Sequence, residues 1–336
     1  FELTETDMMM QTAEQLMAAK QYEQAAEQFE KVVAADSMRT DAWDKLGHCY
    51  VELRQFHLAA KAWKRALAIE PDNVELMSKL GFAQVSAEQF EDAAATYEKM
   101  LRLDPNSYDA HVHLGFVYQK LRDTKKAIEH YRKALQAKPD DVTTAGSLAK
   151  LQADAGQLDE AMATYRKAIA AAEGDQARRL RSDLGKMLIA AKRWDDAAAV
   201  YGELVEQYPD RAAYQYNLGI SLMQAKRYAK AIPHFEKAIE LKPDFSTAYQ
   251  YLAQCYNETE RYEQAIATIR KALPKAKNKA GLYCAWGRAL EKEGLYDEAI
   301  EKFQMAENDP RYGAYARKQI ERQRNLKQRE KMMKNR

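Results

Sequence analysis

Few side chains in this sequence are spaced for catalysis or metal binding. The closest histidine pair is His111-x-His113, and residues two apart on a helix point in different directions, so the pair makes a poor metal site. Neither a phosphate-binding glycine loop nor a serine nucleophile elbow occurs. The carboxylates are spread in the manner of solvated helix faces. The sequence therefore predicts no enzymatic activity, no metal site and no cofactor.

The three cysteines do not form a disulfide framework. They are Cys49, Cys255 and Cys284, and an odd number of cysteines favours a reducing compartment. Cys49 and Cys255 each stand two residues after a recurring small residue, where a buried side chain is expected. We therefore predict core thiols there, with a redox role as the alternative.

The composition favours a soluble helical protein. The 336 residues include 52 Lys and Arg against 50 Asp and Glu, and 46% are hydrophobic. Only 13 Gly and 8 Pro interrupt the chain, and no run of 18 apolar residues suggests a membrane span. The first residue is Phe1, which leaves open a processed precursor or a trimmed chain. Free thiols favour the cytoplasm, whereas a processed start would favour the periplasm or cell envelope.

One column of alanines repeats along the chain. Steps of 34 residues separate these alanines, except for one step of 36. The column consists of Ala25, Ala59, Ala93, Ala127, Ala161, Ala197, Ala231, Ala265 and Ala299. A large side chain follows each alanine by four residues, and a glycine or alanine precedes it by twelve. Five repeats also have a proline twelve residues after the alanine, namely Pro71, Pro105, Pro139, Pro209 and Pro243.

These columns predict a hairpin of two helices in each repeat. Helices approach to about 8–10 Å only where the side chains between them are small. The large side chain one turn after the alanine lies on the same face, where we expect it to fill the gap between hairpins. Proline then ends the second helix. Because one hairpin cannot bury its apolar face, stacked hairpins must share a continuous core.

The pattern resembles the tetratricopeptide repeat family. The second repeat reads DAWDKLGHCY…FHLAAKAWKRALAIEPDN from Asp41, and the seventh reads YNLGISLMQAKRYAKAIPHFEKAIELKPD from Tyr216. The resemblance implies an all-α solenoid of helix–turn–helix repeats that forms a right-handed superhelix with a C-terminal capping helix. Nine repeats fit at 6–39, 40–73, 74–107, 108–141, 142–175, 178–211, 212–245, 246–279 and 280–311, followed by a basic helix or tail at 312–336.

Four repeats depart from the pattern. The first has Met9, Thr12 and Ala13 where the family usually has Trp, Leu and Gly, which suits an atypical N-terminal cap. The fifth lacks its closing proline and is followed by two extra residues near 173–177, so we expect the superhelix to bend or loosen there. The eighth has Pro274 too early, which predicts a short second helix. The ninth has Pro310 one residue early.

In this family the first helices line a concave groove. If position 1 is the first residue of each repeat, the resemblance implies that positions 2, 5, 6, 9, 12 and 13 face the groove. Position 2 is acidic in the first four repeats, either to offset the helix dipole or as an acidic rail for a basic ligand. The predicted partner-binding residues are Phe82, Val85, Val112, Phe116, Lys150, Arg179, Lys186, Asn217, Tyr251 and Gln254.

Two kinds of contact are expected in this groove. Phe82 and Phe116 occupy the same position in consecutive repeats, so they are either apolar anchors for a partner or parts of the core. Asn217 stands where the family often has an asparagine that hydrogen-bonds an extended peptide. Lys186 matches one basic position of the family's clamp for a terminal carboxylate. The rest of that clamp is missing, because Thr247 and Tyr251 replace its basic residues.

The two ends of the chain carry opposite charge. Residues 1–36 have a net charge of −6 and residues 311–336 a net charge of +8. The first half of the basic segment should cap the last hairpin, and the second half, which is poor in apolar residues, is expected to be frayed or free. Electrostatic contacts are predicted for Arg317, Lys318, Arg322, Arg324, Lys327 and Arg329. Alternatively, this segment only aids solubility.

The sequence predicts a protein–protein interaction scaffold that holds an extended peptide or helix of a partner. One alternative is a scaffold that assembles with itself, acidic end to basic end, as a homo-oligomer. A second alternative is the targeting arm of a larger enzyme. Outside the basic segment the chain has a net charge of −6 and shows no known nucleic-acid motif, which argues against nucleic-acid and membrane partners.

Overall fold

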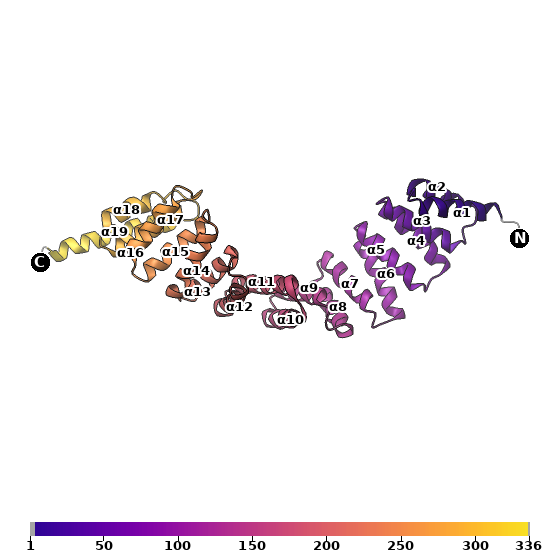
Figure 1. Ribbon diagram of the computed structural model, residues 1–336, viewed down its shortest axis with the longest axis horizontal. Coiled ribbons are helices and arrows are strands. Elements are labelled where there is room, and N and C mark those ends of the chain that lie inside the picture. The colour runs from indigo at the N-terminus through magenta and orange to yellow at the C-terminus, as the bar shows by residue number, and fades with distance from the viewer. Residues whose placement is uncertain (1–3, 335–336) are drawn as a thin grey trace. The chain divides into compact units, whose positions relative to one another are not determined.

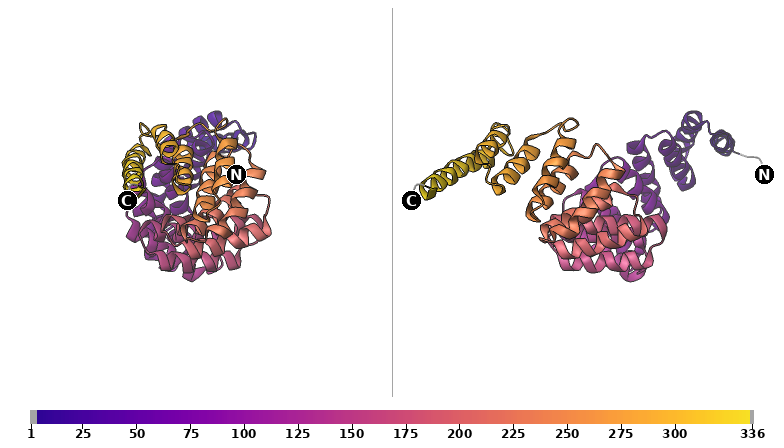
Figure 2. Two further views of the ribbon diagram at one scale, coloured as in Figure 1. Left: turned by 90° about the vertical axis from the view of Figure 1, so that its left-hand side faces the viewer. Right: turned by 60° about the vertical axis from the view of Figure 1, so that its left-hand side comes forward.

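A computed structural model describes residues 4–334 of the chain, which form nineteen α-helices and no strand (Figure 1). The chain divides into two compact units, a first unit of residues 1–172 and a second unit of residues 173–336. Each unit is a stack of helix hairpins, as the views in Figure 2 also show. The fold is the all-α solenoid that the repeats predict.

Ten helices belong to the first unit. They are α1 (Glu5–Ala18), α2 (Tyr22–Ala35), α3 (Thr40–Glu52), α4 (Phe56–Ile69), α5 (Val74–Ser86), α6 (Phe90–Leu103), α7 (Tyr108–Lys120), α8 (Thr124–Ala137), α9 (Val142–Asp154) and α10 (Leu158–Ala171). The second unit contains α11 (Gly174–Ala190), α12 (Trp194–Gln207), α13 (Ala212–Gln224), α14 (Tyr228–Leu241), α15 (Ser246–Glu258), α16 (Tyr262–Ala272), α17 (Ala280–Lys292), α18 (Tyr296–Gln304) and α19 (Gly313–Lys334).

The turn inside each hairpin has a left-handed residue five positions before the recurring alanine. Seven of these residues are not glycine, and the other two are Gly156 and Gly294. The seven are Lys20, Arg54, Glu88, Arg122, Lys192, Lys226 and Glu260, with φ between 56° and 61°. A left-handed side chain costs roughly 1–2 kcal/mol. This strain recurs because the tight turn brings the two helices into contact.

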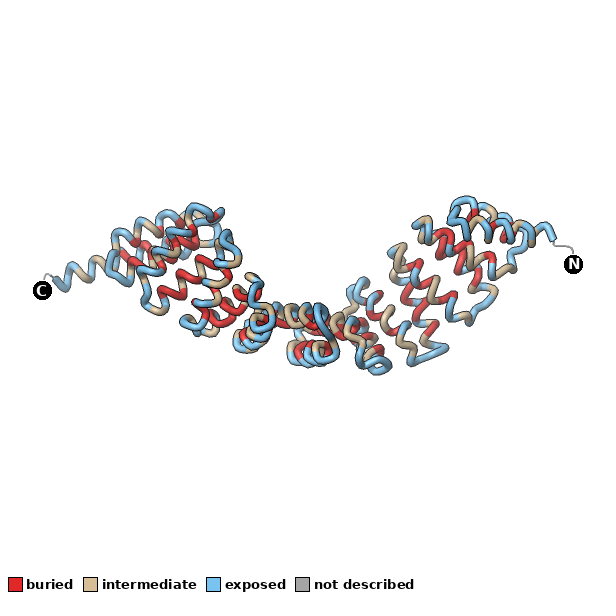
Figure 3. Tube along the Cα trace, in the orientation of Figure 1, coloured by how far each residue is buried: buried red, intermediate tan, exposed pale blue. Residues whose placement is uncertain are grey.

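The recurring alanines and the large side chains that follow them form the core. All nine alanines are fully buried, and no large side chain of the column is more than 4% exposed. The column reads Phe29, Trp63, Tyr97, Tyr131, Tyr165, Tyr201, Phe235, Ile269 and Phe303. Buried residues recur in every hairpin between exposed ones (Figure 3). The three cysteines are buried and free, which confirms the predicted core thiols at Cys49 and Cys255.

Several of the large side chains contact the next hairpin, as the sequence suggested; Tyr97 stacks on His113 and Phe235 contacts Tyr251. The same side chains also pack inside their own hairpin. Six of them lie directly on the glycine of the first helix of their own hairpin. A Cβ built on Gly81 would lie 2.4 Å from Cζ of Tyr97, and one built on Gly219 would lie 2.8 Å from Cε1 of Phe235. These distances are too short for real contacts, so the ring itself occupies the space that a side chain would need.

In three places, a part-buried hydrogen bond joins a hairpin to the one before it. The Tyr118 hydroxyl donates to Glu98, and the Tyr256 hydroxyl donates to Glu236 Oε1 at 2.5 Å. Tyr50 donates to Glu30 in the same way. In each case the tyrosine is at position 11 and the glutamate twenty residues earlier. A buried tyrosine needs such a partner, because an unpaired hydroxyl would cost about 1–3 kcal/mol.

A second hydrogen bond between repeats joins the side chain at position 4 to the carbonyl of the proline that ends the preceding repeat. His111 Nε2 lies 3.0 Å from the Pro105 oxygen, and its Nδ1 lies 3.0 Å from Nδ1 of His130. In the second unit, Gln215 Nε2 donates to the Pro209 oxygen at 3.0 Å, and its Oε1 lies 2.8 Å from Nδ1 of His234. The polar pair is therefore repeated with a different residue at position 4.

The departures of the fifth and eighth repeats from the pattern appear as changes in helix length. Helix α16 ends at Ala272, two residues before Pro274, and has 11 residues where α14 has 14. Near 173–177, the extra residues lengthen α11 at its start to 17 residues. The boundary between the two units falls at the same place, after Ala172.

The expected frayed end is wrong for the described residues, because α19 continues to Lys334. Its first half packs against α17 and α18 through Ala316 and Ile320, as expected of a cap. Lys and Arg are good helix formers, and ion pairs hold the next turns. Arg322 pairs with Glu291 at 2.9 Å and Lys327 with Asp297 at 2.5 Å.

The charges are unequal between the units. The first unit has 21 Lys and Arg against 27 Asp and Glu, a net charge of −6. The second has 31 against 23, a net charge of +8. In the described residues, no helix has both the length and the apolar character that crossing a membrane requires.

Candidate functional site

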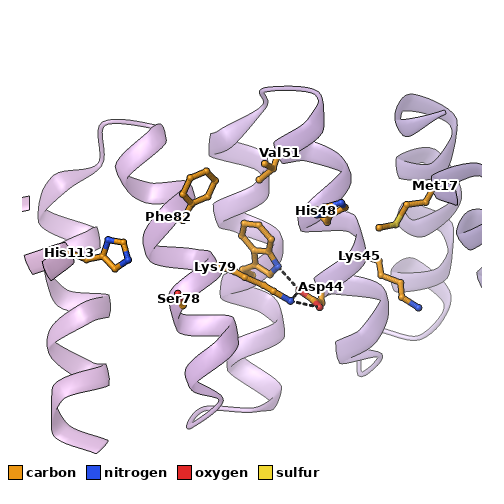
Figure 4. A pocket seen from close by; sticks show the side chains of 10 residues that line it. Met17, Asp44, Lys45, His48, Val51, Ser78, Lys79, Phe82 and His113 are labelled. Atoms are coloured by element: carbon orange, nitrogen blue, oxygen red, sulfur yellow. Dashed lines mark hydrogen bonds and ion pairs between the residues drawn. The ribbon is translucent and has the colours of Figure 1, made fainter. Parts of the chain in front are cut away.

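A pocket of about 570 Å³ opens in the first unit between α1, α3, α5 and α7 (Figure 4). Its walls are Met17, Asp44, Lys45, His48, Val51, Trp63, Ser78, Lys79, Phe82 and His113. All of these residues except Trp63 occupy positions 5, 6, 9 or 12 of their repeats. These are positions of the stripe that the sequence assigned to the concave groove, so the pocket lies on the first-helix face of the stacked hairpins.

Asp44 is the polar centre of the pocket (Figure 4). Its carboxylate accepts a hydrogen bond from Trp63 Nε1 at 2.8 Å and two from Lys79 Nζ at 2.9 and 3.0 Å. Lys79 also pairs with Glu75 at 2.8 Å. Burial disfavours the charge on Lys79, but its bonds with Glu75 and Asp44 outweigh burial and raise its pKa. These bonds join helices α3, α4 and α5, which carry Asp44, Trp63 and Lys79, and hold them in fixed positions.

Phe82 forms the apolar wall of the pocket. Half of this residue is exposed, and its ring makes an edge contact with Phe56 at a centroid distance of 6.4 Å. Met17 and Val51 add apolar surface from the two preceding repeats. Lys45 at the pocket edge is paired with Glu14. An exposed ring that is fixed on one side and open on the other suits an apolar anchor.

His113 closes the other end of the pocket. Its imidazole stacks on the Tyr97 ring, with centroids 4.8 Å apart and an interplanar angle of 15°. Burial lowers the pKa of His113, although Asp109 partly opposes this. The ring is therefore neutral near pH 7. His111 points to different partners, Pro105 and His130, so the two rings do not converge on a metal.

The structure separates the predicted groove residues of the first unit. Phe82 lines the pocket, whereas Phe116 is 37% exposed one repeat further on, with Lys120 Nζ 5.2 Å from its ring centroid. Val85 packs against the hydrophobic core and Val112 is half-buried. Lys150 is exposed on α9.

Sequence reasoning missed most of the polar residues in this pocket. Asp44, Lys45 and Lys79 occupy groove positions 5 and 6, so the repeat numbering placed them correctly. Their pairing was not foreseen, because ion pairs between hairpins depend on the stagger between adjacent helices. His48 and His113 were passed over for the same reason.

The remaining predicted residues belong to the second unit. Arg179 and Lys186 are exposed, and Lys186 pairs with Asp183 at 3.1 Å. Asn217 is half-buried. Tyr251 packs against Tyr216 and Phe235, with centroids 6.2 and 6.1 Å apart. Gln254 lines a smaller pocket.

The predicted electrostatic residues lie along α19. Arg317 donates to the Glu307 oxygen at 2.6 Å, and Arg322 and Lys327 form the ion pairs described above. Lys318, Arg324 and Arg329 are exposed and make no ion pair within residues 4–334. Arg336, which contributes to the basic charge, lies outside the described residues. No cluster of three or more His, Cys, Asp or Glu in the described part is placed to hold a metal ion.

Three profiles of one repeat family match the chain. Tetratricopeptide repeat profiles match residues 120–184, 222–283 and 182–244. The profile described as "Cytochrome c-type biogenesis protein H TPR domain" matches residues 33–141. Together these matches run from residue 33 to residue 283. Among curated proteins, none matches the chain.

Several solved structures match the chain at low sequence identity. The crystal structure of MamA is 23% identical over 51% of this chain and 96% of its own, with a TM-score of 0.44. The TPR domain of P58(IPK) is 15% identical over 97% and 99%, with a TM-score of 0.34. YrrB, titled "a TPR protein with an unusual peptide-binding site", is 21% identical over 66% and 96%, with a TM-score of 0.39. With the repeat columns, the hairpins and the profile matches in agreement, the chain belongs to the tetratricopeptide repeat family.

Proposed function

We propose that this protein is a non-enzymatic scaffold that binds a segment of a partner protein in the concave face of its first unit. The observation on which this rests is the pocket beneath Phe82, where a half-exposed ring borders the Asp44–Lys79 ion pair. Large exposed side chains beside fixed polar groups are typical of protein-binding centres. An apolar side chain of the partner would enter against Phe82, and Phe116 would contact the segment one repeat further along.

The test is affinity capture from the native source followed by mass spectrometry. Phe82→Ala with Phe116→Ala should remove the partner, because central anchors typically cost 2 kcal/mol or more, about 30-fold in affinity. The matched control is Leu58→Ala, which removes an exposed apolar side chain from α4, a second helix. A partner retained by the groove variant, or lost equally with the control, would contradict binding at this site.

Affinity capture with a second variant tests whether the partner also contacts the second unit. Lys186→Glu with Asn217→Ala changes the predicted groove residues of α11 and α13 without touching the first unit. If the partner also spans the second unit, this variant should weaken capture on its own. Unchanged capture would limit the binding site to the first unit.

Self-assembly is a second candidate function, favoured by the charges of the two units. The first has a net charge of −6 and the second +8, and Arg324 and Arg329 are exposed on α19. Opposite charges on the two units favour contact between copies at low ionic strength. Salt would weaken such contacts.

Sedimentation velocity at low and high salt tests self-assembly. Arg324→Glu with Arg329→Glu should yield a monomer at low salt. The control, Lys230→Glu with Lys271→Glu, makes the same charge change at two exposed lysines of α14 and α16 and should leave the assembly intact. A monomer at every salt concentration would exclude this function. Deleting α19 is a poorer test, because it would uncover buried Ala316 and Ile320.

A further inference from the structure

A second, smaller pocket of about 220 Å³ lies in the second unit between α15, α17 and the start of α19. It is lined by Gln250, Gln254, Asn257, Gly281, Cys284, Ala285, Arg288, Tyr312 and Tyr315. The residues from α15 and α17 occupy groove positions of the eighth and ninth repeats. The two tyrosines come from the C-terminal segment, so that segment completes the wall of a groove pocket.

Gly281 and Gln250 show how this wall is closed. A Cβ on Gly281 would lie 2.2 Å from Oε1 of Gln250. A side chain at position 281 would therefore displace the Gln250 amide from this place. From there, Gln250 Nε2 donates to the Tyr312 hydroxyl at 2.8 Å. The amide links α15 to the residue before α19, across the first turn of α17.

Asn257 is the unsatisfied group of the pocket. It is only 6% exposed, and its Nδ2 donates to the Ala285 carbonyl at 2.8 Å. Its Oδ1 is buried and has no hydrogen-bond partner within the described residues. A buried acceptor without a donor costs free energy, so most such groups in proteins are paired. A ligand that supplies an N–H group would satisfy this oxygen.

The charges around the pocket favour a neutral ligand. No carboxylate is among its lining residues, so an ammonium group would lack a counter-charge. Arg288 is the one cation in the lining, and Glu258 already holds its guanidinium at 2.8 Å. Burial raises the pKa of Tyr315, so its hydroxyl stays protonated and can donate. The lining thus offers hydrogen-bond donors and acceptors with little free charge.

We propose that this pocket binds a neutral carboxamide, supplied by an Asn or Gln side chain of a bound segment. A carboxamide both donates and accepts hydrogen bonds, so its N–H can reach Asn257 while its oxygen accepts from Tyr315. The volume suits one side chain, not a whole cofactor. This inference rests on the proposed scaffold function only for the source of the carboxamide, because the pocket itself lies outside the first unit.

Ligand-observed NMR titrations of the full chain test the pocket with three small probes. N-acetylglutamine N-methylamide is compared with the corresponding capped glutamate and methionine, which have similar length but are anionic or apolar. The glutamine probe should bind at least about tenfold more tightly than the methionine probe, as expected for one or two net hydrogen bonds. Tighter binding of glutamate would instead make this an anion site at Arg288. Equal binding of all three probes, or none, would overturn the proposal.

Variants link any binding to these side chains. Tyr315→Phe removes only the hydroxyl and keeps the ring that packs on Phe303, and it should erase most of the preference for glutamine over methionine. Asn257→Leu should do the same, provided that its melting curve shows a folded chain. Tyr283→Phe removes a hydroxyl outside the pocket and should leave probe binding unchanged. If Tyr315→Phe kept the full preference, the assignment would be wrong.

The probe titration and the partner capture fail independently. Capture depends on Phe82 and Phe116, which lie in the first unit, whereas the probes report on Asn257 and Tyr315 without any partner protein. Probe binding without a captured partner would leave the carboxamide pocket standing and remove the scaffold function. If the chain captured a partner but bound no probe, the scaffold function would stand and the carboxamide pocket would be excluded.

Discussion

At the scale of single residues, the packing of a ring on a glycine sets the geometry of most hairpins. The sequence contains both columns, the small residue at position 8 and the large one sixteen residues later. It does not say that the two touch, because contact depends on how far apart the helix axes lie. In six repeats the ring leaves no space for a Cβ. The residue at position 8 is therefore restricted by the ring that packs on it, and not only by the close crossing of the two helices.

Substituting alanine for Gly185 should therefore destabilise the second unit. The new Cβ would lie 2.7 Å from Cε2 of Tyr201, and overpacking of this kind typically costs about 1–3 kcal/mol. The matched control is Gly202→Ala on α12, where a Cβ would meet no atom within 4 Å. That change should stabilise by up to about 1 kcal/mol through helix propensity. Urea denaturation measures both, and equal effects would refute the packing argument.

The His111–His130 pair predicts a pH-dependent stability of the first unit. His111 Nε2 must donate to the Pro105 carbonyl, so in the neutral pair its Nδ1 accepts from His130. Burial, followed by the neighbouring His111, lowers the pKa of His130 to about 4. Between pH 6.5 and 4 the unfolded state binds this proton more readily than the folded state. The free energy of unfolding should thus fall as the pH drops below 6.5 and level off for this group below 4.

Denaturation of wild type and His130→Gln from pH 7.5 to 4.5 measures this contribution. His130 is only half-buried, so we expect about 1 kcal/mol at pH 5 after allowing for solvent screening. The variant should show a shallower pH dependence, because glutamine stays neutral while it can still bond to His111. Replacing the exposed His57 by glutamine is the control. Parallel pH profiles for wild type and His130→Gln would contradict the assignment.

At the scale of helices, the sequence predicts helix ends well where a recurring residue marks them. The prolines mark the ends of α4, α6, α8, α12 and α14, each of which stops two residues earlier. The C-terminal helix was underestimated, because its second half has few apolar residues. Ion pairs from Arg322 and Lys327 to earlier helices hold it, and such pairs between distant segments leave no periodic signal. The same holds for the pocket, whose apolar anchor Phe82 was predicted but whose Asp44–Lys79 pair was not.

Removing α19 should expose the end of the second unit. A chain that ends after residue 312 loses buried Ala316 and Ile320, which pack in one cluster with Ala299 and Phe303. The loss of the Ile320 side chain alone corresponds to about 1.5–3 kcal/mol of burial. A chain that ends after residue 324 keeps both residues and should melt within a few degrees of wild type. Calorimetry compares the two, and equal melting temperatures would show that α19 is not a cap.

At the scale of the whole molecule, the chain divides after Ala172 into two compact units. Repeat arrays gain stability from each repeat and from each contact between neighbours, and each of the two compact units has buried clusters of its own. Clusters around Phe29 and Tyr97 belong to the first unit, and clusters around Phe235 and Phe303 belong to the second. Their opposite net charges further distinguish the units.

Residues 1–172 and 173–336 should each fold when expressed alone. Each unit has its own buried clusters, and Gly174, with a φ of 53° and open space around it, stands at the junction. Circular dichroism should show helical spectra and cooperative melting for both pieces. A chain divided inside a hairpin, after residue 190, is the control, because it separates α11 from α12 and should leave the ring of Tyr201 without its glycine. If the 173–336 piece were unfolded while the intact chain melted in one transition, the two units would be one cooperative body and the division after Ala172 would have no energetic meaning.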